Sequence, residues 1–169
     1  AAYLLQLRRD PDLEKTLDEL TDVIAGAQHE NGYLYPSHTT GAGASKDMMG
    51  DRPYAFIVHS HELYNVGHLY EAAVAYYQAT GKTKLLNVAE KSAEHINRVI
   101  FEGDSDYNQG KPIQQAPGHQ EMELALVKLY RVTGKPLYLD MARRFLEIRG
   151  VTYVPEGEGV MAPTYAQQH

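Results

Sequence analysis

The feature that most constrains the fold is a helix–turn–helix pattern that occurs twice, centred on two Thr-Gly-Lys turns. When Gly81 is superposed on Gly134, an offset of 53 residues (134 minus 81), AVAYYQATGKTKLLNVAEKSAEHI lies over LVKLYRVTGKPLYLDMARRFLEI. Apolar residues on either side of each turn recur at the spacing of one helix face. The turn Asp10-Pro11-Asp12 stands at the corresponding place of an earlier unit. Because a helical hairpin cannot bury its own apolar face, these units are predicted to stack on one another.

The length of the repeat, about fifty residues, favours a ring of hairpins over common superhelical repeats such as the tetratricopeptide unit of about 34 residues. In an (α/α)6 toroid the long return loops gather at one end of the inner helices. The sequence therefore predicts an all-α fold, in which residues 1–169 are a fragment of one α/α-barrel catalytic domain, about half of an (α/α)6 toroid. The predicted hairpins cover about residues 1–28, 60–100 and 118–150.

Loops are predicted between the hairpins, where helical periodicity is lost. The longest loop runs from His29 to about Ser60 and is rich in glycine and proline, although it also contains tyrosines. A loop of this length inside a domain is typical of a functional or a disordered segment. Further loops are expected over residues 101–117 and beyond Gly150, and both ends of the chain resemble cut ends of a longer protein.

Composition excludes several classes of partner. The formal net charge of −6 and the absence of a basic cluster argue against nucleic acid, which requires a basic surface. No run of 18 apolar residues is present, so no membrane span is expected. The chain has no cysteine, which rules out disulfides and thiolate metal ligands within it. These observations leave a cytoplasmic, periplasmic or secreted location open.

Histidines at the starts of the expected inner helices are the residues best suited to chemistry. His61 and His68 are seven residues apart, on one face of a helix, and Gly-His pairs at 67–68 and 118–119 stand in similar contexts. A neutral imidazole offers one hydrogen-bond donor and one acceptor, which suits a polyhydroxylated ligand. Tyrosines in the loops, among them Tyr33 and Tyr64, would add flat apolar faces for sugar rings.

The sequence does not predict a metal site within the chain. His61 and His68 are seven residues apart, whereas the zinc motif HExxH places its histidines four residues apart. Hydrogen bonding between a histidine and a nearby carboxylate, as for His68 with Glu71 or His119 with Glu123, explains these pairs without a metal ion.

Several strings carry a family resemblance: GYLYP at 32–36, HELYNVGHLYEAAVAYYQATGK at 61–82, GHQEMELALVKLYRVTGKPLYLDMARRFLEIRG at 118–150 and the closing YAQQH. Together they resemble the β-L-arabinofuranosidases of glycoside hydrolase family 127 and their relatives. The resemblance implies an (α/α)6 barrel followed by β-sandwich domains. It also implies retaining hydrolysis of β-L-arabinofuranosides, with a zinc-bound cysteine thiolate as nucleophile and glutamates as acid/base and zinc ligand.

The resemblance assigns this chain a role in binding the sugar. His68 and His119 match positions that contact the sugar in that family, and Tyr33, His61, Glu62 and Tyr64 lie in the matching loop region. The nucleophile, the acid/base residue and the zinc ligands correspond to positions beyond His169, so no catalytic residue and no cofactor are expected within this chain. The chain alone is therefore predicted to be inactive, with zinc held elsewhere in the parent enzyme.

Two other functions remain open on the sequence alone. One is a helical-repeat scaffold that binds a partner protein without catalysis, which exposed stripes on the inner helices would favour. The other is a different (α/α)6 carbohydrate-active enzyme that uses a pair of carboxylates, although no convincing pair is present. The paired histidines favour the sugar site and predict that His68 and His119 lie at the same end of the helices.

Overall fold

The computed structural model describes residues 1–41 and 46–149, and helices are the regular secondary structure of that part, with no strand in it. The predicted all-α fold is confirmed. The helices are α1 (Ala2–Leu7), α2 (Pro11–Ala27), α3 (Pro36–Thr40), α4 (Lys46–Met49), α5 (Glu62–Thr80), α6 (Lys84–Asn97), α7 (Glu121–Thr133) and α8 (Pro136–Arg149), with a π-helical turn at Arg98–Glu102 and a 3-10 turn at Asn108–Gly110.

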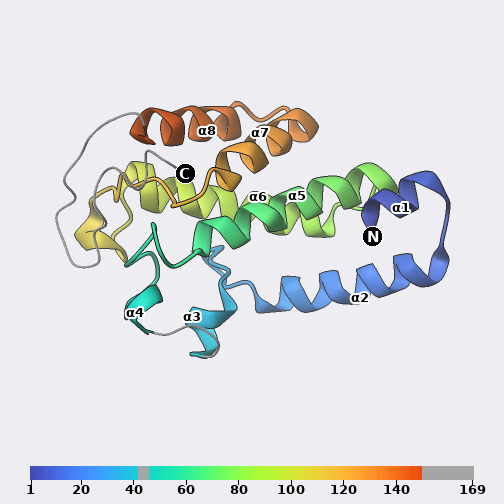
Figure 1. Cartoon of the computed structure of the whole chain (residues 1–169), viewed down its shortest axis with the longest axis horizontal. Helices are drawn as coiled ribbons and strands as arrows, with labels where there is room; N and C mark the ends of the chain where they lie inside the picture. The colour runs from blue at the N-terminus through green and yellow to red at the C-terminus, as the bar shows by residue number, and fades with distance from the viewer. Residues whose placement is uncertain (42–45, 150–169) are drawn as a thin grey trace.

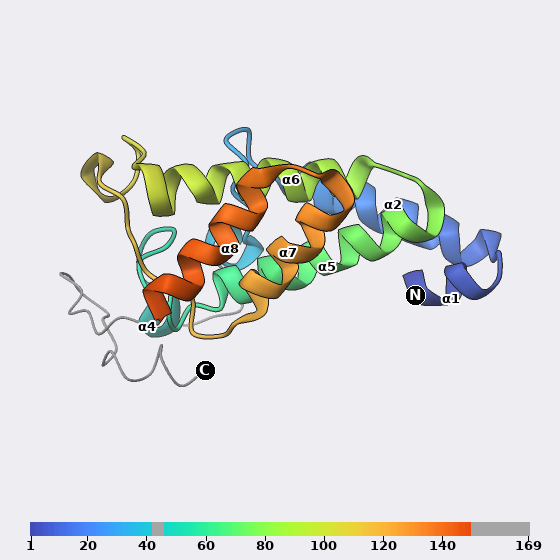
Figure 2. The same ribbon diagram turned by 90° about the horizontal axis from the view of Figure 1, so that it is seen from above.

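The helices other than α3 and α4 are arranged as three stacked pairs, the short α1 with α2, α5 with α6 and α7 with α8 (Figure 1). Helix α5 lies at the centre and packs against α1 on one side and α7 on the other, while α6 packs against α2. Helices α1, α5 and α7 therefore form one row and α2, α6 and α8 the other, as the view from above also shows (Figure 2). Two rows of alternating helices are the arrangement of a partial α/α barrel.

The turns of the repeat share their hydrogen bonds as well as their sequence. Gly81 and Gly134 end α5 and α7 in the left-handed conformation, with φ of 75° and 71°. The preceding threonine hydroxyls, of Thr80 and Thr133, donate to the carbonyl four residues earlier, at 2.7 and 2.8 Å. Glycine adopts this backbone conformation without the steric penalty of a Cβ atom, which explains why both helices end at this dipeptide.

A lysine after each turn forms ion pairs with the second helix of the preceding helix pair. Lys82 Nζ lies 2.5 Å from Glu14 Oε1 and 2.6 Å from Asp18 Oδ2, both on α2. Lys135 Nζ lies 2.8 Å from Glu90 Oε1 on α6. The acidic residues of α2 are four residues apart, so they share one helix face. These partly exposed ion pairs set the register between neighbouring units more than they add stability.

The first hairpin begins with a local capping arrangement that the sequence signals directly. The side chain of Asp10 accepts a hydrogen bond from the backbone N–H of Leu13 at 3.1 Å, and Pro11 occupies the first turn of α2. Proline is tolerated there because its missing N–H would have no partner within the helix. Asp10 and Pro11 together fix where α2 starts.

The long predicted loop from His29 to Ser60 differs most from expectation. It contains the short helices α3 and α4, and its aromatic side chains Tyr33, Tyr35 and Tyr54 are buried in the core. The helix expected from near Gly118 begins three residues later, at Glu121. The predicted loop beyond Gly150, the YAQQH string and part of the glycine-rich stretch at 41–50 lie outside the described residues.

The core lies between the two rows and against the folded loop. Its largest fully buried side chains include Tyr70 of α5, Leu126 of α7 and Phe145 of α8. The Tyr70 hydroxyl lies 3.0 Å from the Ser92 hydroxyl of α6, so the polar end of this ring has a partner inside the core. Among the described helices, none combines the length and apolar character needed to cross a membrane.

Candidate functional site

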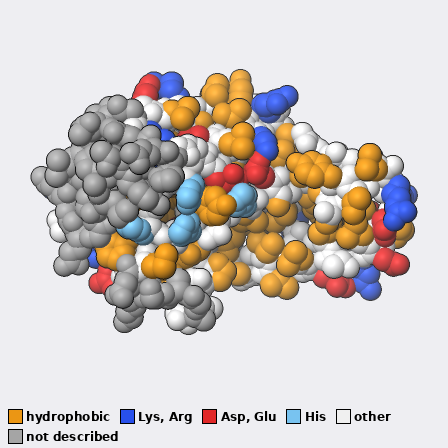
Figure 3. Space-filling view, viewed as in Figure 1, with side chains coloured by type: hydrophobic (Ala, Val, Ile, Leu, Met, Phe, Trp, Pro, Cys, Tyr) orange, Lys and Arg blue, Asp and Glu red, His pale blue; other side chains and the backbone are white. Residues whose placement is uncertain are grey.

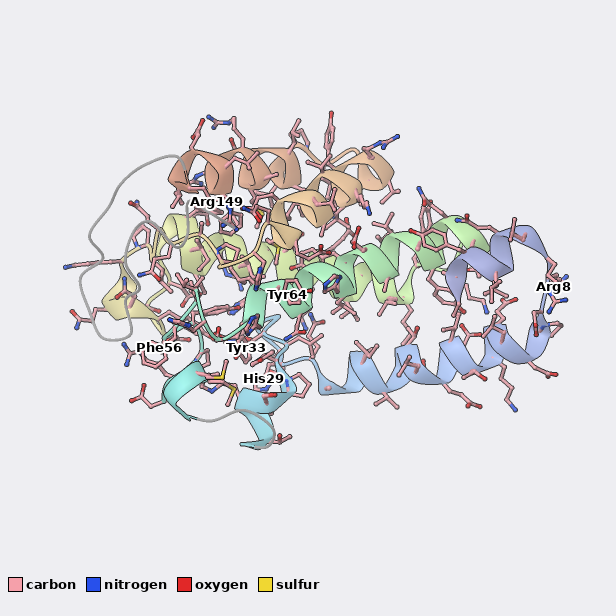
Figure 4. All side chains as sticks on the ribbon, in the orientation of Figure 1. Arg8, His29, Tyr33, Phe56, Tyr64 and Arg149 are labelled. Atoms are coloured by element: carbon pink, nitrogen blue, oxygen red, sulfur yellow. The ribbon has the colours of Figure 1, made fainter. Side chains whose placement is uncertain are left out.

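Four aromatic side chains meet where α5 and α7 begin. The ring of Tyr64 lies 4.5 Å from that of His68 and 4.9 Å from that of His119, between centroids. The His61 ring stacks on His119 at 5.3 Å with an interplanar angle of 21°. We call His61, Tyr64, His68 and His119 the ring cluster. Figure 4 shows Tyr64 at the start of α5, far from Arg8 at the opposite end of the helices.

The local sequence explains how the ring cluster forms. Tyr64 and His68 are four residues apart on α5, so their side chains lie on one face a turn apart. His61 stands immediately before α5 with φ of 56°, and His119 stands two residues before α7. The predicted proximity of His68 and His119 is confirmed in that both pack against Tyr64. The side chain of His68 is 49% exposed, so the cluster is accessible.

Figure 3 shows several histidine side chains gathered on one stretch of surface, next to acidic side chains. In the structure, a small network of charged side chains surrounds His68. His68 Nδ1 lies 3.2 Å from Glu121 Oε1 and 3.7 Å from Glu71 Oε2, and Lys128 pairs with Glu71. Burial raises the pKa of the Glu121 carboxyl above its ordinary value. Both carboxylates lie on the Nδ1 side of the imidazole, so the Nε2 atom is the one available to face a ligand.

Gly67 allows α5 and α7 to approach closely enough for this contact. A Cβ atom at Gly67 would stand 2.8 Å from Glu121 Cγ and 3.1 Å from the Glu121 carbonyl carbon. Both distances are shorter than ordinary carbon–carbon contacts, and the second involves backbone that cannot rotate away. The glycine of the Gly-His pair at 67–68 is therefore needed for packing, and the histidine after it is brought beside Glu121.

His119 is held by a buried ion pair at the end of α8. The Arg149 guanidinium pairs with the Glu123 carboxylate and also donates to the His119 carbonyl at 2.8 Å. The side chains of Arg149 and Glu123 are only 7% and 5% exposed. Figure 4 shows Arg149 and Tyr64 both away from the end of the molecule that carries Arg8. The pair thus fixes the backbone from which the His119 ring projects.

Glu62 and Tyr33, which were also predicted to bind sugar, lie in the interior instead. They are 1% and 4% exposed, and the Tyr33 hydroxyl donates to Glu62 Oε1 at 2.7 Å. The backbone N–H of Tyr54 and the hydroxyl of Ser60 also donate to the Glu62 carboxylate. The geometry gives neither Glu62 nor Tyr33 a surface for a ligand, so direct contact with a sugar stays a prediction without support.

Sequence reasoning missed most of the partners that hold the ring cluster. Glu121 and Arg149 lie within the string at 118–150 but were not singled out, and Ser60 did not stand out among the loop residues. Only the closeness in sequence of His68 to Glu71 and of His119 to Glu123 gave a signal, and it did not reveal that Arg149 joins His119 and Glu123. A charged residue on an otherwise apolar helix face, such as Glu123 beside Met122, is the pattern that points to a buried ion pair.

Comparison with known proteins decides the family. The protein-family model described as β-L-arabinofuranosidase, GH127 catalytic domain, matches residues 1–169. This chain belongs to the GH127 family. A non-reducing end β-L-arabinofuranosidase from Bifidobacterium longum is 40% identical over 151 residues, which are 89% of this chain and 21% of that protein. The family resemblance inferred from the sequence is confirmed.

Solved structures of GH127 enzymes share the fold. A GH127 β-L-arabinofuranosidase from Geobacillus stearothermophilus T6 aligns with a TM-score of 0.76 and 41% identity, covering 89% of this chain and 22% of that chain. A second GH127 β-arabinofuranosidase aligns with a TM-score of 0.78 and 42% identity, covering 88% and 23%. The chain therefore spans between a fifth and a quarter of the length of these GH127 relatives.

The zinc ion implied by the GH127 resemblance does not fit the donors of this chain. Its expected ligands include cysteine thiolates, and the chain has no cysteine. Among the described residues, donor atoms of His68, Glu71 and Glu121 lie within 4.8 Å of one another. Lys128 pairs with Glu71, however, so the charge of this group is already partly balanced by the protein. We assign no zinc chemistry to it.

Replacing Gly67 with alanine is expected to destabilise this GH127 chain by about 1–3 kcal/mol, because the added methyl group overpacks the α5–α7 contact. The matched control is Gly26→Ala on α2, where a Cβ atom would meet nothing within 4 Å. That change is expected to stabilise the protein by up to about 1 kcal/mol, since alanine is the better helix former. Urea unfolding of both variants measures the difference, and equal effects would contradict the close approach at Gly67.

Proposed function

We propose that this chain forms part of the catalytic barrel of a GH127 glycoside hydrolase and that its ring cluster binds a β-L-arabinofuranoside or a related glycan. The observation that carries the proposal is the meeting of three imidazoles and one phenol at the accessible start of α5 and α7. The GH127 relatives named as β-L-arabinofuranosidases support the choice of sugar.

The chemistry of the ring cluster suits a neutral sugar. Imidazole and phenol groups donate and accept hydrogen bonds, and their rings offer apolar faces to the C–H groups of a furanose. The carboxylates near His68 lie on the Nδ1 side of its ring, so the Nε2 atom is the one that can hydrogen-bond to a sugar. In this proposal the cluster positions the substrate, while the nucleophile, the acid/base group and the zinc ion come from residues outside this chain.

In the complete enzyme that carries these residues, His68→Ala and His119→Ala are each expected to lower kcat/KM by roughly ten- to a hundredfold. Each change removes a positioning hydrogen bond of about 0.5–1.5 kcal/mol and leaves a buried polar group of the sugar unpaired, which adds to the loss. Neither variant is expected to lose zinc, because the proposed metal ligands lie elsewhere. Steady-state kinetics on an aryl β-L-arabinofuranoside, with metal analysis of the same samples, measures both quantities.

Asn87→Ala is the control, since Asn87 is exposed on α6 and lies outside the ring cluster and the loop before it. It is expected to have a much smaller effect on kcat/KM. A full loss of zinc in His68→Ala or His119→Ala would show that the histidine is a metal ligand and would refute its assignment as a sugar contact. Unchanged kinetics in both variants would refute the sugar site itself.

The chain alone is expected to release no arabinose from an aryl β-L-arabinofuranoside, because it has no thiolate to attack the anomeric carbon. The test is an arabinose assay on residues 1–169 beside the complete enzyme. Zinc is added to both samples so that metal supply does not limit either one. Turnover by residues 1–169 above the buffer rate would contradict the assignment of the reacting groups to residues outside the chain.

A further inference from the structure

We propose that Glu62 is a positioning residue. Its buried carboxylate holds the segment from Tyr54 to His61 in the conformation that places the His61 ring against the other rings of the ring cluster. This inference rests on the proposed function for its effect on activity. Its structural part, the placement of His61, stands on the contacts alone.

The Glu62 carboxylate gathers donors from three places in the folded loop. Oε1 accepts the Tyr33 hydroxyl at 2.7 Å, and Oε2 accepts the Ser60 hydroxyl at 2.8 Å. The backbone N–H of Tyr54 reaches both oxygens, at 3.2 and 3.1 Å. A carboxylate that accepts this many hydrogen bonds has no lone pair left for a ligand, and 1% exposure gives a ligand no path to it.

The segment that these bonds hold is strained at two positions. Tyr54 and His61 both have positive φ, 60° and 56°, where residues other than glycine rarely lie. The backbone N–H of Tyr54 donates to the Glu62 carboxylate. The hydroxyl of Ser60, the residue directly before His61, donates to the same carboxylate. Ser60 is also held through its carbonyl, which accepts a hydrogen bond from the Tyr35 hydroxyl at 2.8 Å. We call these hydrogen bonds to Glu62 and Ser60 the frame. Strained backbone persists only when surrounding contacts determine it, and here those contacts converge on Glu62.

The conformation of His61 has a direct effect on the ring cluster. His61 precedes α5 but makes no side-chain capping bond, so its imidazole is available to stack on His119 and to contact Tyr64 at 5.8 Å between centroids. Glu62, the first residue of α5, is 1% exposed. Glu62 therefore faces the core while His61 faces the ring cluster, and the carboxylate acts on the site only through the backbone between them.

The tyrosine hydroxyl that donates to Glu62 stays protonated, so its hydrogen bond in the frame is kept. Burial beside Glu62 raises the pKa of the Tyr33 and Tyr54 hydroxyls, so the Tyr33 hydroxyl keeps the proton that it donates. A glutamine at position 62 has the same shape but replaces one acceptor oxygen with an NH2 donor. In either amide orientation, that NH2 group would face the Tyr54 N–H. Glu62→Gln thus weakens the frame without a change in size.

The first test follows the His61 imidazole in the complete enzyme with 13C-labelled histidine, its signal assigned through His61→Ala. Glu62→Gln is expected to shift the His61 Cε1–Hε1 signal, and Tyr33→Phe, which removes one donor and keeps the carboxylate, is expected to shift it less in the same direction. The matched control Glu30→Gln, at an exposed position before α3, is expected to leave it in place. An unmoved His61 signal in both Glu62→Gln and Tyr33→Phe would overturn the proposal, and Tyr33→Phe decides if Glu62→Gln does not fold.

The second test is a double-mutant cycle on kcat/KM. Glu62→Gln alone is expected to lower kcat/KM by about tenfold, as for the loss of hydrogen bonds to a charged group. In the His61→Ala background the same change is expected to cost little more, because Glu62 acts through His61. Equal losses in both backgrounds would overturn the positioning role. If His61→Ala leaves kcat/KM unchanged, the proposed sugar site is wrong at that residue, and the imidazole signal alone decides the placement of His61.

Discussion

Arg149→Met is expected to lower the free energy of unfolding by about 3–5 kcal/mol, because it leaves the Glu123 carboxylate buried without its partner cation. The His119 carbonyl also loses a donor at 2.8 Å, so the start of α7 is expected to shift. Chemical denaturation measures the change in stability. Reduced kcat/KM in the complete enzyme would report the accompanying shift of the His119 ring.

Arg143 on the same helix supplies the matched control. It pairs with Asp140 and Glu147 at 2.7 and 2.6 Å, but its side chain is 62% exposed. Arg143→Met is expected to change stability little, since water replaces these partners. The double variant Arg149→Met with Glu123→Met is expected to recover much of the loss, because no charge is then left buried. An effect of Arg149→Met no larger than that of Arg143→Met would contradict the buried pair.

The stability of the protein is expected to fall in acid because of His95. This residue of α6 is fully buried among the rings of Tyr33, Tyr54 and Tyr107. Burial, together with the neighbouring Arg98 cation, lowers its pKa from 6.5 to about 4. The unfolded chain therefore binds a proton more readily than the folded one. The contribution of neutral His95 is complete above pH 6.5 and is lost as the pH falls toward 4.

The expected loss is about 3 kcal/mol by pH 4, from the size of the shift at about 1.36 kcal/mol per pKa unit. The measurement is the free energy of unfolding of the wild type and of His95→Asn at several pH values. Other titrating groups are common to both proteins, so the difference between them isolates His95. That difference is expected to shrink steadily between pH 6.5 and 4, and a constant difference would contradict the lowered pKa.

His95 also connects acid stability to the candidate site. The rings of Tyr33 and Tyr54 that pack against it belong to the residues that donate to the Glu62 carboxylate. Protonation of His95 would place a positive charge under this folded loop. The loop that presents His61 is therefore expected to loosen in the same pH range in which global stability declines.

The sequence by itself determined the helical fold and the positions of most helix ends. Those features depend on contacts within a few residues: the apolar stripes, the Asp10 cap and the Thr-Gly turns at Gly81 and Gly134. The period of the repeat and the two Gly-His pairs also placed His68 and His119 at one end of the helices. The loop from His29 to Ser60 was harder to interpret, since its folding depends on Glu62 and on the core rather than on a local period.

Only the tertiary structure decided which side chains hold the site. Glu62 follows His61 directly and was grouped with it, yet the turn of the helix sends its carboxylate into the core to meet Tyr33, 29 residues earlier in the chain. Arg149 lies 26 residues from Glu123, and its ion pair forms because α8 runs back along α7. The spacing of residues along one helix fixes which of them share a face. Which face meets which partner depends on how the helices pack, and that packing is settled by the whole chain.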